Sequence, residues 1–511
     1  MTKDSNLEET LRKGIEEVLS KYRYSVLDDV KLKLIKHEVT SYLESLVIKG
    51  KIHQPEVTLE KGDSVGVSIG IKYQTPAVSL TVRILPKGAG DSTPKLSALD
   101  LLENRTIIVL PWDVEKPTWL DAMDGRPRPV ESLDEFFRLT KPAVEVELES
   151  GKGRRMVQME FSDLESFSPE KILERSEQIQ SKDDVSRVLA RARPLEEACR
   201  GVALFFQNAE SLGKPVDPNV FFLLASPEHI KTRYGESSCL NALKKELEIK
   251  NERFDKRESY SIVCLPFSID PEMQREYVRC VERYGICVIA DGPRIEPIED
   301  LEYMSEHLRR YGEGFRSAYY VVNRVLARRP YRHFGEREAL YLSATFPFAG
   351  RLYALDLKES IFGPIQGELM GISELETRLK KNEAARLSDL GLIPITEEDA
   401  IFYPFPNPVR DSALTRVRFE DLIAKNLQHI LNAHGSSVIT EQTKDEINRE
   451  VKISMDGQVS LGRIKEYTIN VEQDPSQPGV ITVPVNIKFL NYGFGEAGES
   501  VVKVRSTPLA E

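Results

Sequence analysis

The chain has 511 residues, of which 41% are hydrophobic and 30% are charged, an ordinary globular composition that excludes a collagen-like or globally disordered protein. Because this length exceeds what one hydrophobic core usually serves, we expect roughly two to four domains. The 70 basic and 81 acidic residues give a net charge of −11. This balance argues against nucleic acid as the main partner, since phosphate-binding surfaces are normally basic.

The chain carries no membrane or secretion signal that we recognise. No apolar run approaches the roughly 20 residues needed to span a bilayer, and the N-terminus lacks the apolar core of a secretory signal. We therefore expect a soluble, cytoplasmic protein without direct membrane insertion. The five cysteines are odd in number and include no CxxC pair, which suits a reducing compartment and predicts buried or inert thiols.

The two ends of the chain resemble each other. Apolar residues at helical spacing run from Leu7 to Leu19 in the first copy and from Phe419 to Leu431 in the second. In the same register, Glu38-Val39 matches Glu450-Val451. Each end predicts two helices followed by three strands over about 80 residues, a size at which a lone core is marginal. Chance similarity between two amphipathic stretches is the alternative explanation.

The strands of these two modules alternate apolar and other residues, at 65–73 and 78–84 in the first copy and at 483–489 and 501–505 in the second. Period two is typical of a half-buried antiparallel strand. Since open strand edges template pairing with another copy, we predict that these strands join neighbouring subunits. The predicted intersubunit residues are Val65, Val67, Ile69, Ile71, Val78, Leu80, Val82, Val483, Val485, Ile487, Val502 and Val504.

The centre of the chain predicts an α/β body. Strands are expected at 105–110, 143–148 and 156–161, and then a helix with Ser168 as N-cap and Pro169 at its first position. From about residue 196, strands alternate with helices, one of which is expected at 271–284. Continuous apolar runs predict strands that are covered on both faces. These runs lie at 220–225, 260–265 and 286–290.

Two later segments complete this body. Residues 301–328 predict a long helix bent near Gly312, and 336–356 predict two strands around 346–350. The expected fold class is multidomain, α/β and α+β, with a central α/β sandwich and a small α+β module at each end. The expected domains are 1–95, 96–185, 186–415 and 416–511.

The sequence shows no motif in a context that would indicate a catalytic, cofactor-binding or metal-binding site. Residues 491–498 match GxGxxG, but too few residues follow for the helix and ribose-binding acid of a dinucleotide site, so we interpret them as a hairpin. The seven histidines show no metal-ligand spacing, and no GxSxG occurs. We therefore predict no catalytic, cofactor-binding or metal-binding residues and a protein that is not an enzyme. An α/β enzyme stays the less favoured alternative, because catalytic groups assemble in space.

Several short motifs resemble contractile sheath proteins. The two strands and helix start within 144–174, with Phe161-Ser-Asp-Leu-Glu-Ser-Phe-Ser-Pro-Glu170, resemble the small sheath subunit of bacterial type VI secretion systems. From about residue 196 the chain resembles the large sheath subunit and phage tail-sheath proteins. The motifs are Cys264-Leu-Pro-Phe267, Ile289-Ala-Asp-Gly-Pro293, Ser317-Ala-Tyr-Tyr320, Phe346-Pro-Phe-Ala-Gly-Arg-Leu-Tyr353, Phe362-Gly-Pro364 and Leu387-Ser-Asp-Leu-Gly-Leu-Ile-Pro394. Small- and large-subunit features on one chain depart from the usual two-protein arrangement.

This resemblance implies a structural subunit of a contractile injection system that polymerises by β-strand addition into a helical tube. The implied partners are further copies of the chain, an inner tube protein, a baseplate and a disassembly ATPase, and no cofactor is implied. The implied location is the cytoplasm or a phage tail-like particle. A baseplate or cap component of the same machine is the alternative.

Overall fold

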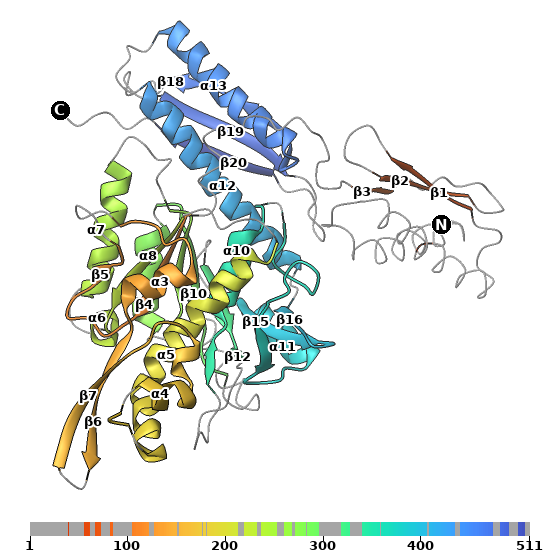
Figure 1. Cartoon of the computed structure of the whole chain (residues 1–511). Coiled ribbons are helices and arrows are strands. Elements are labelled where there is room, and N and C mark those ends of the chain that lie inside the picture. The colour runs from red at the N-terminus through yellow and green to blue at the C-terminus, as the bar shows by residue number, and fades with distance from the viewer. Residues whose placement is uncertain are drawn as a thin grey trace. The chain divides into compact units, whose positions relative to one another are not determined.

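The computed structural model divides the chain into two compact units, Met1–Ser97 and Ala98–Glu511 (Figure 1). It describes residues 39, 56–61, 67–72, 82–84, 105–121, 127–150, 153–175, 177–179, 181–212, 219–231, 237–252, 260–267, 271–282, 284–295, 318–327, 340–357, 359–405, 408–434, 440–473, 481–489 and 499–505.

The first unit contains an antiparallel sheet in the order β1-β2-β3. Its strands are β1 (Glu56–Lys61), β2 (Val67–Lys72) and β3 (Val82–Ile84). The strand that comes second in the sequence therefore lies in the middle, and it pairs with β1 over six residues. Val39 is helical and fully buried.

An eight-stranded sheet, in the order β16-β15-β11-β10-β9-β4-β8-β5, forms the centre of the second unit. The strands from β15 to β8 in this order pair in parallel, whereas β5 and β16 at the two ends are antiparallel. Because β4 lies between β8 and β9, the chain changes direction across the sheet at β4, a topological switch point. The mixed α/β class is as predicted. The strands are β4 (Thr106–Pro111), β5 (Thr118–Trp119), β8 (Val220–Ala225), β9 (Ile262–Leu265), β10 (Cys287–Asp291), β11 (Ala318–Val322), β15 (Leu392–Glu398) and β16 (Ile401–Pro404).

The inner strands β4, β8, β9, β10 and β11 are apolar at nearly every position because both faces of the sheet are covered. In β4, Ile108 and Leu110 belong to one hydrophobic core, and Ile107 and Val109 belong to the core on the other face. The continuous apolar runs at 220–225, 260–265 and 286–290 are confirmed as strands in or overlapping β8, β9 and β10.

Helices contribute to both cores. On the face of Ile108 lie α3 (Leu133–Thr140), α5 (Lys182–Glu210) and α10 (Thr345–Ala354). On the face of Ile107 lie α6 (Pro227–Lys231), α7 (Ser238–Glu252), α8 (Pro271–Glu282) and α11 (Lys381–Asp389).

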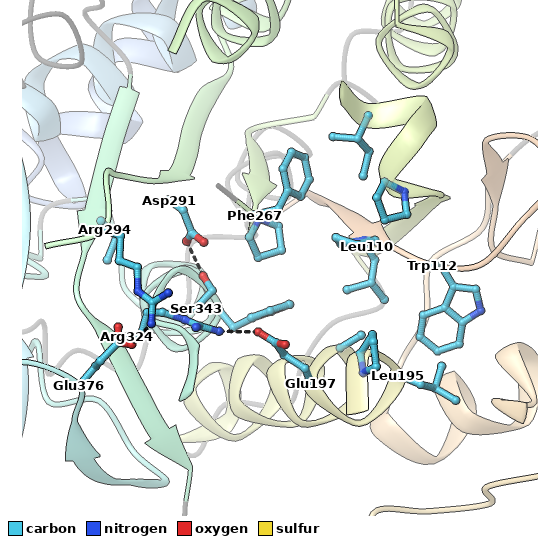
Figure 2. A pocket seen from close by; sticks show the side chains of 18 of the residues that line it. Leu110, Trp112, Leu195, Glu197, Phe267, Asp291, Arg294, Arg324, Ser343 and Glu376 are labelled. Atoms are coloured by element: carbon cyan, nitrogen blue, oxygen red, sulfur yellow. Dashed lines mark hydrogen bonds and ion pairs between the residues drawn. The ribbon is translucent and has the colours of Figure 1, made fainter. Parts of the chain in front are cut away.

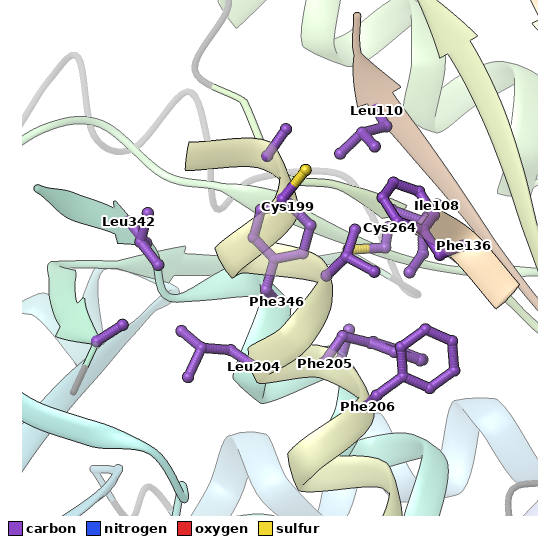
Figure 3. Packing of buried hydrophobic residues seen from close by; sticks show 14 of the residues in the cluster. Ile108, Leu110, Phe136, Cys199, Leu204, Phe205, Phe206, Cys264, Leu342 and Phe346 are labelled. Atoms are coloured by element: carbon purple, nitrogen blue, oxygen red, sulfur yellow. The ribbon is translucent and has the colours of Figure 1, made fainter. Parts of the chain in front are cut away.

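Helices α5 and α10 cross in very close contact, at two glycines. A Cβ atom on Gly350 of α10 would lie 2.2 Å from the carbonyl oxygen of Phe205, and one on Gly201 of α5 would lie 2.3 Å from the ring of Phe346. Figure 3 shows Phe346 beside Cys199 in this packed region. The missing side chains therefore let the two helices approach each other.

A hairpin and a capped helix precede α5. The hairpin strands are β6 (Ala143–Ser150) and β7 (Gly153–Glu160), and the 3-10 turn η2 (Glu165–Phe167) leads into α4 (Pro169–Arg175). The Ser168 hydroxyl accepts a hydrogen bond from the Lys171 amide at 3.3 Å. The predicted N-cap and first-position proline of α4 are confirmed.

Two predictions for the later part of the body were wrong. Residues 318–327, expected to be helical, form β11 and β12 (Arg324–Ala327), while 301–317 lie outside the described residues. The apolar, β-branched and aromatic run at 318–322 is buried on both faces, so its periodicity cannot separate strand from helix.

The region 336–356 contains one strand, β13 (Tyr341–Ser343), and then helix α10 instead of a second strand. Every residue of α10 is buried, so no polar face marks it as a helix. Pro347 lies in its first turn, where a missing N–H costs nothing. With β14 (Ile372–Leu375), β12 and β13 form a small antiparallel sheet in the order β13-β12-β14.

Residues 408–505, here called the C-terminal module, follow the predicted order of two helices and then strands. The elements are α12 (Pro408–Ala433), α13 (Glu441–Ser460), β17 (Ile464–Ile469), β18 (Glu472–Gln473), β19 (Ile481–Phe489) and β20 (Glu499–Arg505). Among the residues that the structure describes, no helix is long and apolar enough to cross a membrane.

Candidate functional site

The C-terminal module is built around β19. Strands β17 and β18 pair with one edge of β19, and β20 pairs with the other edge over seven residues. The register places Val483 opposite Val504 and Val485 opposite Val502. The structure thus brings together the predicted strand residues of this module within one sheet. The segment 490–498, which we interpreted as a hairpin, lies outside the described residues.

Pro484 in β19 lies opposite the break between β17 and β18. The carbonyl oxygen of Pro484 accepts a hydrogen bond from the amide of Asn470, between β17 and β18. Since the N–H and C=O of one residue point to the same neighbour in an antiparallel ladder, the donor that Pro484 lacks also faces this break. The ladder between β19 and β20 therefore loses no hydrogen bond to the proline.

One face of this sheet is buried and the other is polar. Ile481, Val483, Val485 and Ile487 are almost fully buried in a core that also includes residues of α12 and α13. On the opposite face, Lys488 forms an ion pair with Glu466 at 2.7 Å. Among the described strands, none pairs with the outer edge of β17 or of β20. The sheet therefore has a fixed inner face and two edges at which backbone pairing can continue.

Charged side chains attach this module to the α/β body. The Arg463 guanidinium, which is 5% exposed, donates to both carboxylate oxygens of Asp356 at 3.1 and 3.3 Å and to Gln458 at 3.1 Å. The Lys425 ammonium donates to the carbonyl oxygen of Tyr260 at 2.9 Å. Bidentate pairing fixes direction as well as distance, so the module is held in a defined orientation on the body.

The first unit holds the other predicted strand residues. Val67, Ile69 and Ile71 lie in β2, and Val82 lies in β3 opposite Ile69. The remaining three residues, Val65, Val78 and Leu80, lie outside the described residues.

The sheet of the first unit has the strand order of the C-terminal module, with the second long strand in the middle. In the predicted alignment of the two copies, the helical residues Val39 and Val451 occupy matching positions, and both are fully buried.

The five cysteines form no disulfide among the described residues and are buried, as expected. Burial raises the pKa of the Cys239 thiol to about 11 and that of Cys287 to about 12. It raises the pKa of the Cys199 and Cys264 thiols as well. These thiols are therefore protonated and unreactive at neutral pH. The described residues include no group of three or more metal-ligating side chains placed to hold an ion.

A cavity of about 750 Å³ lies at the carboxyl ends of β4, β9, β10 and β11, and sequence reasoning missed it. Figure 2 shows charged and hydroxyl side chains gathered on one side of it and apolar side chains on the other. The charged side includes two ion pairs, Arg324–Glu197 and Arg294–Glu376, each at 2.6 Å. One signal was available, because carboxyl ends of parallel strands meet at one edge of the sheet and Asp291 ends such a strand.

Asp291, the last residue of β10, is one of the charged groups that line this cavity. Its Oδ1 atom accepts hydrogen bonds from the hydroxyls of Ser343 and Thr345, at the start of α10. Burial raises the pKa of the Asp291 carboxyl to about 6, although these two hydrogen bonds and the nearby Arg324 lower it. Desolvation therefore outweighs the stabilisation of the charged form.

The comparisons with known proteins connect this fold to one family. Residues 187–406 match the family model described as the type VI secretion system TssC/VipB central domain. No curated protein matches the chain at a significant level.

Solved structures with a related arrangement include the cryo-EM structure of the anti-feeding prophage (AFP) baseplate. The match to this structure has a TM-score of 0.45 and 12% sequence identity, and it covers 82% of this chain and 96% of that chain. The sheath tail protein Lin1278 from Listeria innocua gives 0.42 at 10% identity, covering 80% and 97%. The sheath tail protein DSY3957 from Desulfitobacterium hafniense gives 0.39 at 11% identity, covering 82% and 99%.

The fold and the surfaces described above define a multidomain α/β protein with a strand-pairing module at its C-terminal end. Its central residues, 187–406, are similar to the TssC/VipB central domain of the type VI secretion system.

Proposed function

We propose that the chain polymerises by β-strand addition between copies, forming the contractile sheath of a type VI secretion-like or phage tail-like injection system. The match of residues 187–406 to the TssC/VipB central domain carries this proposal. On this basis the tube surrounds an inner tube protein, starts from a baseplate, is recycled by a disassembly ATPase, and lies in the cytoplasm or in a phage tail-like particle.

The C-terminal strand supports the mode of assembly. Strand β20 pairs with β19 through seven backbone-paired positions, and residues 490–498 connect the two strands. Backbone pairing does not depend on which copy supplies the strand, so β20 of a neighbour can occupy the same groove by domain swapping. The outer edges of β17 and β20 offer two further places for an added strand. Repeated head-to-tail exchange that does not close gives a helical tube.

The C-terminal module also has the anchorage that a mechanical link requires. The Arg463–Asp356 pair and the Lys425 contact to Tyr260 join the module to the α/β body. A pull on an exchanged strand therefore passes through β19 to the helices and then to the body. Without a nucleotide motif in the sequence, contraction would draw its work from two packings of the same subunits.

A truncation series tests this proposal. Under negative-stain electron microscopy, the concentrated full-length chain should form tubes, and a chain truncated after Gly495, which lacks β20, should not. Truncation after Arg505 is the matched control, because it removes only residues beyond β20. Circular dichroism of each variant establishes that the body is folded.

Two results would contradict the proposal in different ways. If the chain without β20 still forms full-length tubes, strand exchange through β20 is wrong. If the full-length chain remains monomeric or hexameric at high concentration, the sheath role itself fails and a baseplate or cap component is supported.

A further inference from the structure

The cavity at the carboxyl ends of β4, β9, β10 and β11 has the properties of a small-molecule site. Its volume of about 750 Å³ falls within the roughly 300–1,000 Å³ of ligand pockets. It also lies beside the switch point of the parallel sheet, where open α/β sheets bind ligands. Its walls come from the ends of these strands and from β6, α5 and α6.

The polar end of the cavity presents one acceptor atom that no side chain in the described part of the chain uses. Both hydroxyl donors to Asp291, from Ser343 and Thr345, bind Oδ1. No described residue donates a hydrogen bond to Oδ2. The residue is only partly buried and lines the cavity, so a ligand can reach this oxygen. A carboxylate in a site largely removed from water gains most from a charged donor.

The charges of the lining favour a cation as that donor. Two arginines of the lining that Figure 2 labels, Arg294 and Arg324, already pair with Glu376 and Glu197 at 2.6 Å. The cavity lining carries five acidic and three basic side chains, a net charge of −2. The acidic residues are Asp113, Glu145, Glu197, Asp291 and Glu376, and the basic residues are Arg191, Arg294 and Arg324. An anionic ligand would therefore meet net repulsion.

The other end of the cavity is apolar. Leu110, Trp112, Leu195 and Phe267 face it across from the charged side (Figure 2). Burial of a hydrocarbon or aromatic group against this wall would contribute roughly 25 cal/mol for each Å² removed from water. The occupant therefore needs an apolar body as well as a charged head.

We propose that this cavity binds a small amphipathic amine, whose protonated amino group donates to Oδ2 of Asp291 and whose apolar body packs against Trp112, Leu195 and Phe267. The proposal concerns a ligand site in the sheath body and is independent of strand exchange.

Calorimetric titration of the full-length chain at pH 8 tests this site, with three probes of one shape. Phenethylamine should bind, while 3-phenylpropionate and 2-phenylethanol should bind at least about 10-fold more weakly, because a charged hydrogen bond is worth about 1.5–3 kcal/mol. Asp291→Asn keeps the size of the side chain and should lower the amine affinity about 10-fold or more. The matched control, Asp389→Asn at an exposed position outside the lining, should change it by less than about 3-fold.

The unmodified chain provides a second test that needs no variant. The amine affinity should fall as the pH is lowered from 7 to 5, since Asp291 becomes protonated in this range. Equal binding of the amine and the carboxylate, full affinity in Asp291→Asn, or no amine binding at millimolar concentration would each overturn the proposal.

Discussion

At the crossing of α5 and α10, the close contact predicts that a larger side chain lowers the stability of the protein. In Gly350→Ala, the new methyl carbon would lie 2.2 Å from the carbonyl oxygen of Phe205 and 3.1 Å from Cβ of Asn208. The first contact is with backbone, so no side-chain rotation relieves it and the helices must separate. Overpacking of this kind costs about 1–3 kcal/mol. A clash with rigid backbone belongs in the upper part of this range, at about 2–3 kcal/mol. Alanine returns up to about 1 kcal/mol in helix propensity, so we expect a net loss of about 1–2 kcal/mol in the free energy of unfolding.

Gly457→Ala in α13 is the matched control. It is the same substitution inside a helix, but no atom lies within 4 Å of the new methyl group. Here only the propensity gain of up to about 1 kcal/mol remains. In thermal unfolding followed by circular dichroism, Gly350→Ala should lower the midpoint by a few degrees and Gly457→Ala should leave it unchanged or raise it. An unchanged or raised midpoint for Gly350→Ala would refute the close-contact argument.

Three further predictions concern charge and reactivity. Arg463→Ala and Asp356→Ala should each lower the free energy of unfolding by about 2–4 kcal/mol, and the double variant should lose no more than either single variant. If the two losses add up in denaturant unfolding, the two groups do not interact. Because burial raises the pKa of the Asp291 carboxyl to about 6, the folded chain binds this proton more tightly than the unfolded chain. Stability should therefore fall as the pH rises from about 4 to about 6. Asp291→Asn should remove this part of the pH dependence of the free energy of unfolding. If the curves of unfolding free energy against pH are parallel for the two proteins, the prediction is wrong. The five buried cysteines should react with a thiol reagent at pH 8 only after unfolding; rapid labelling of the native chain would contradict their placement.

The sequence predicted the elements that have a clear period or a clear cap. The stripe from Phe419 to Leu431 lies in α12, and alternation in β19 separates its buried face from its polar face. Ser168 and Pro169 marked the start of α4 because capping is local chemistry.

The wrong predictions concern segments that are buried on all sides, because such segments show no alternation of apolar and polar residues. Residues 318–322 and α10 are buried at every position, so their class depends on partners far away in the chain. The cavity was missed for a related reason. Asp291, Arg324 and Glu197 come from β10, β12 and α5, three distant segments that only the tertiary fold brings together.

The central claim, that neighbouring copies exchange β20, is tested most directly by a covalent link between the paired strands. Val485 and Val502 lie opposite each other in the register of β19 and β20, so Val485→Cys/Val502→Cys places two thiols on facing positions. After assembly and oxidation, a denaturing gel without reductant should show a ladder of linked chains. If only monomers carrying an internal disulfide appear from intact tubes, β20 stays on its own chain and the account is contradicted.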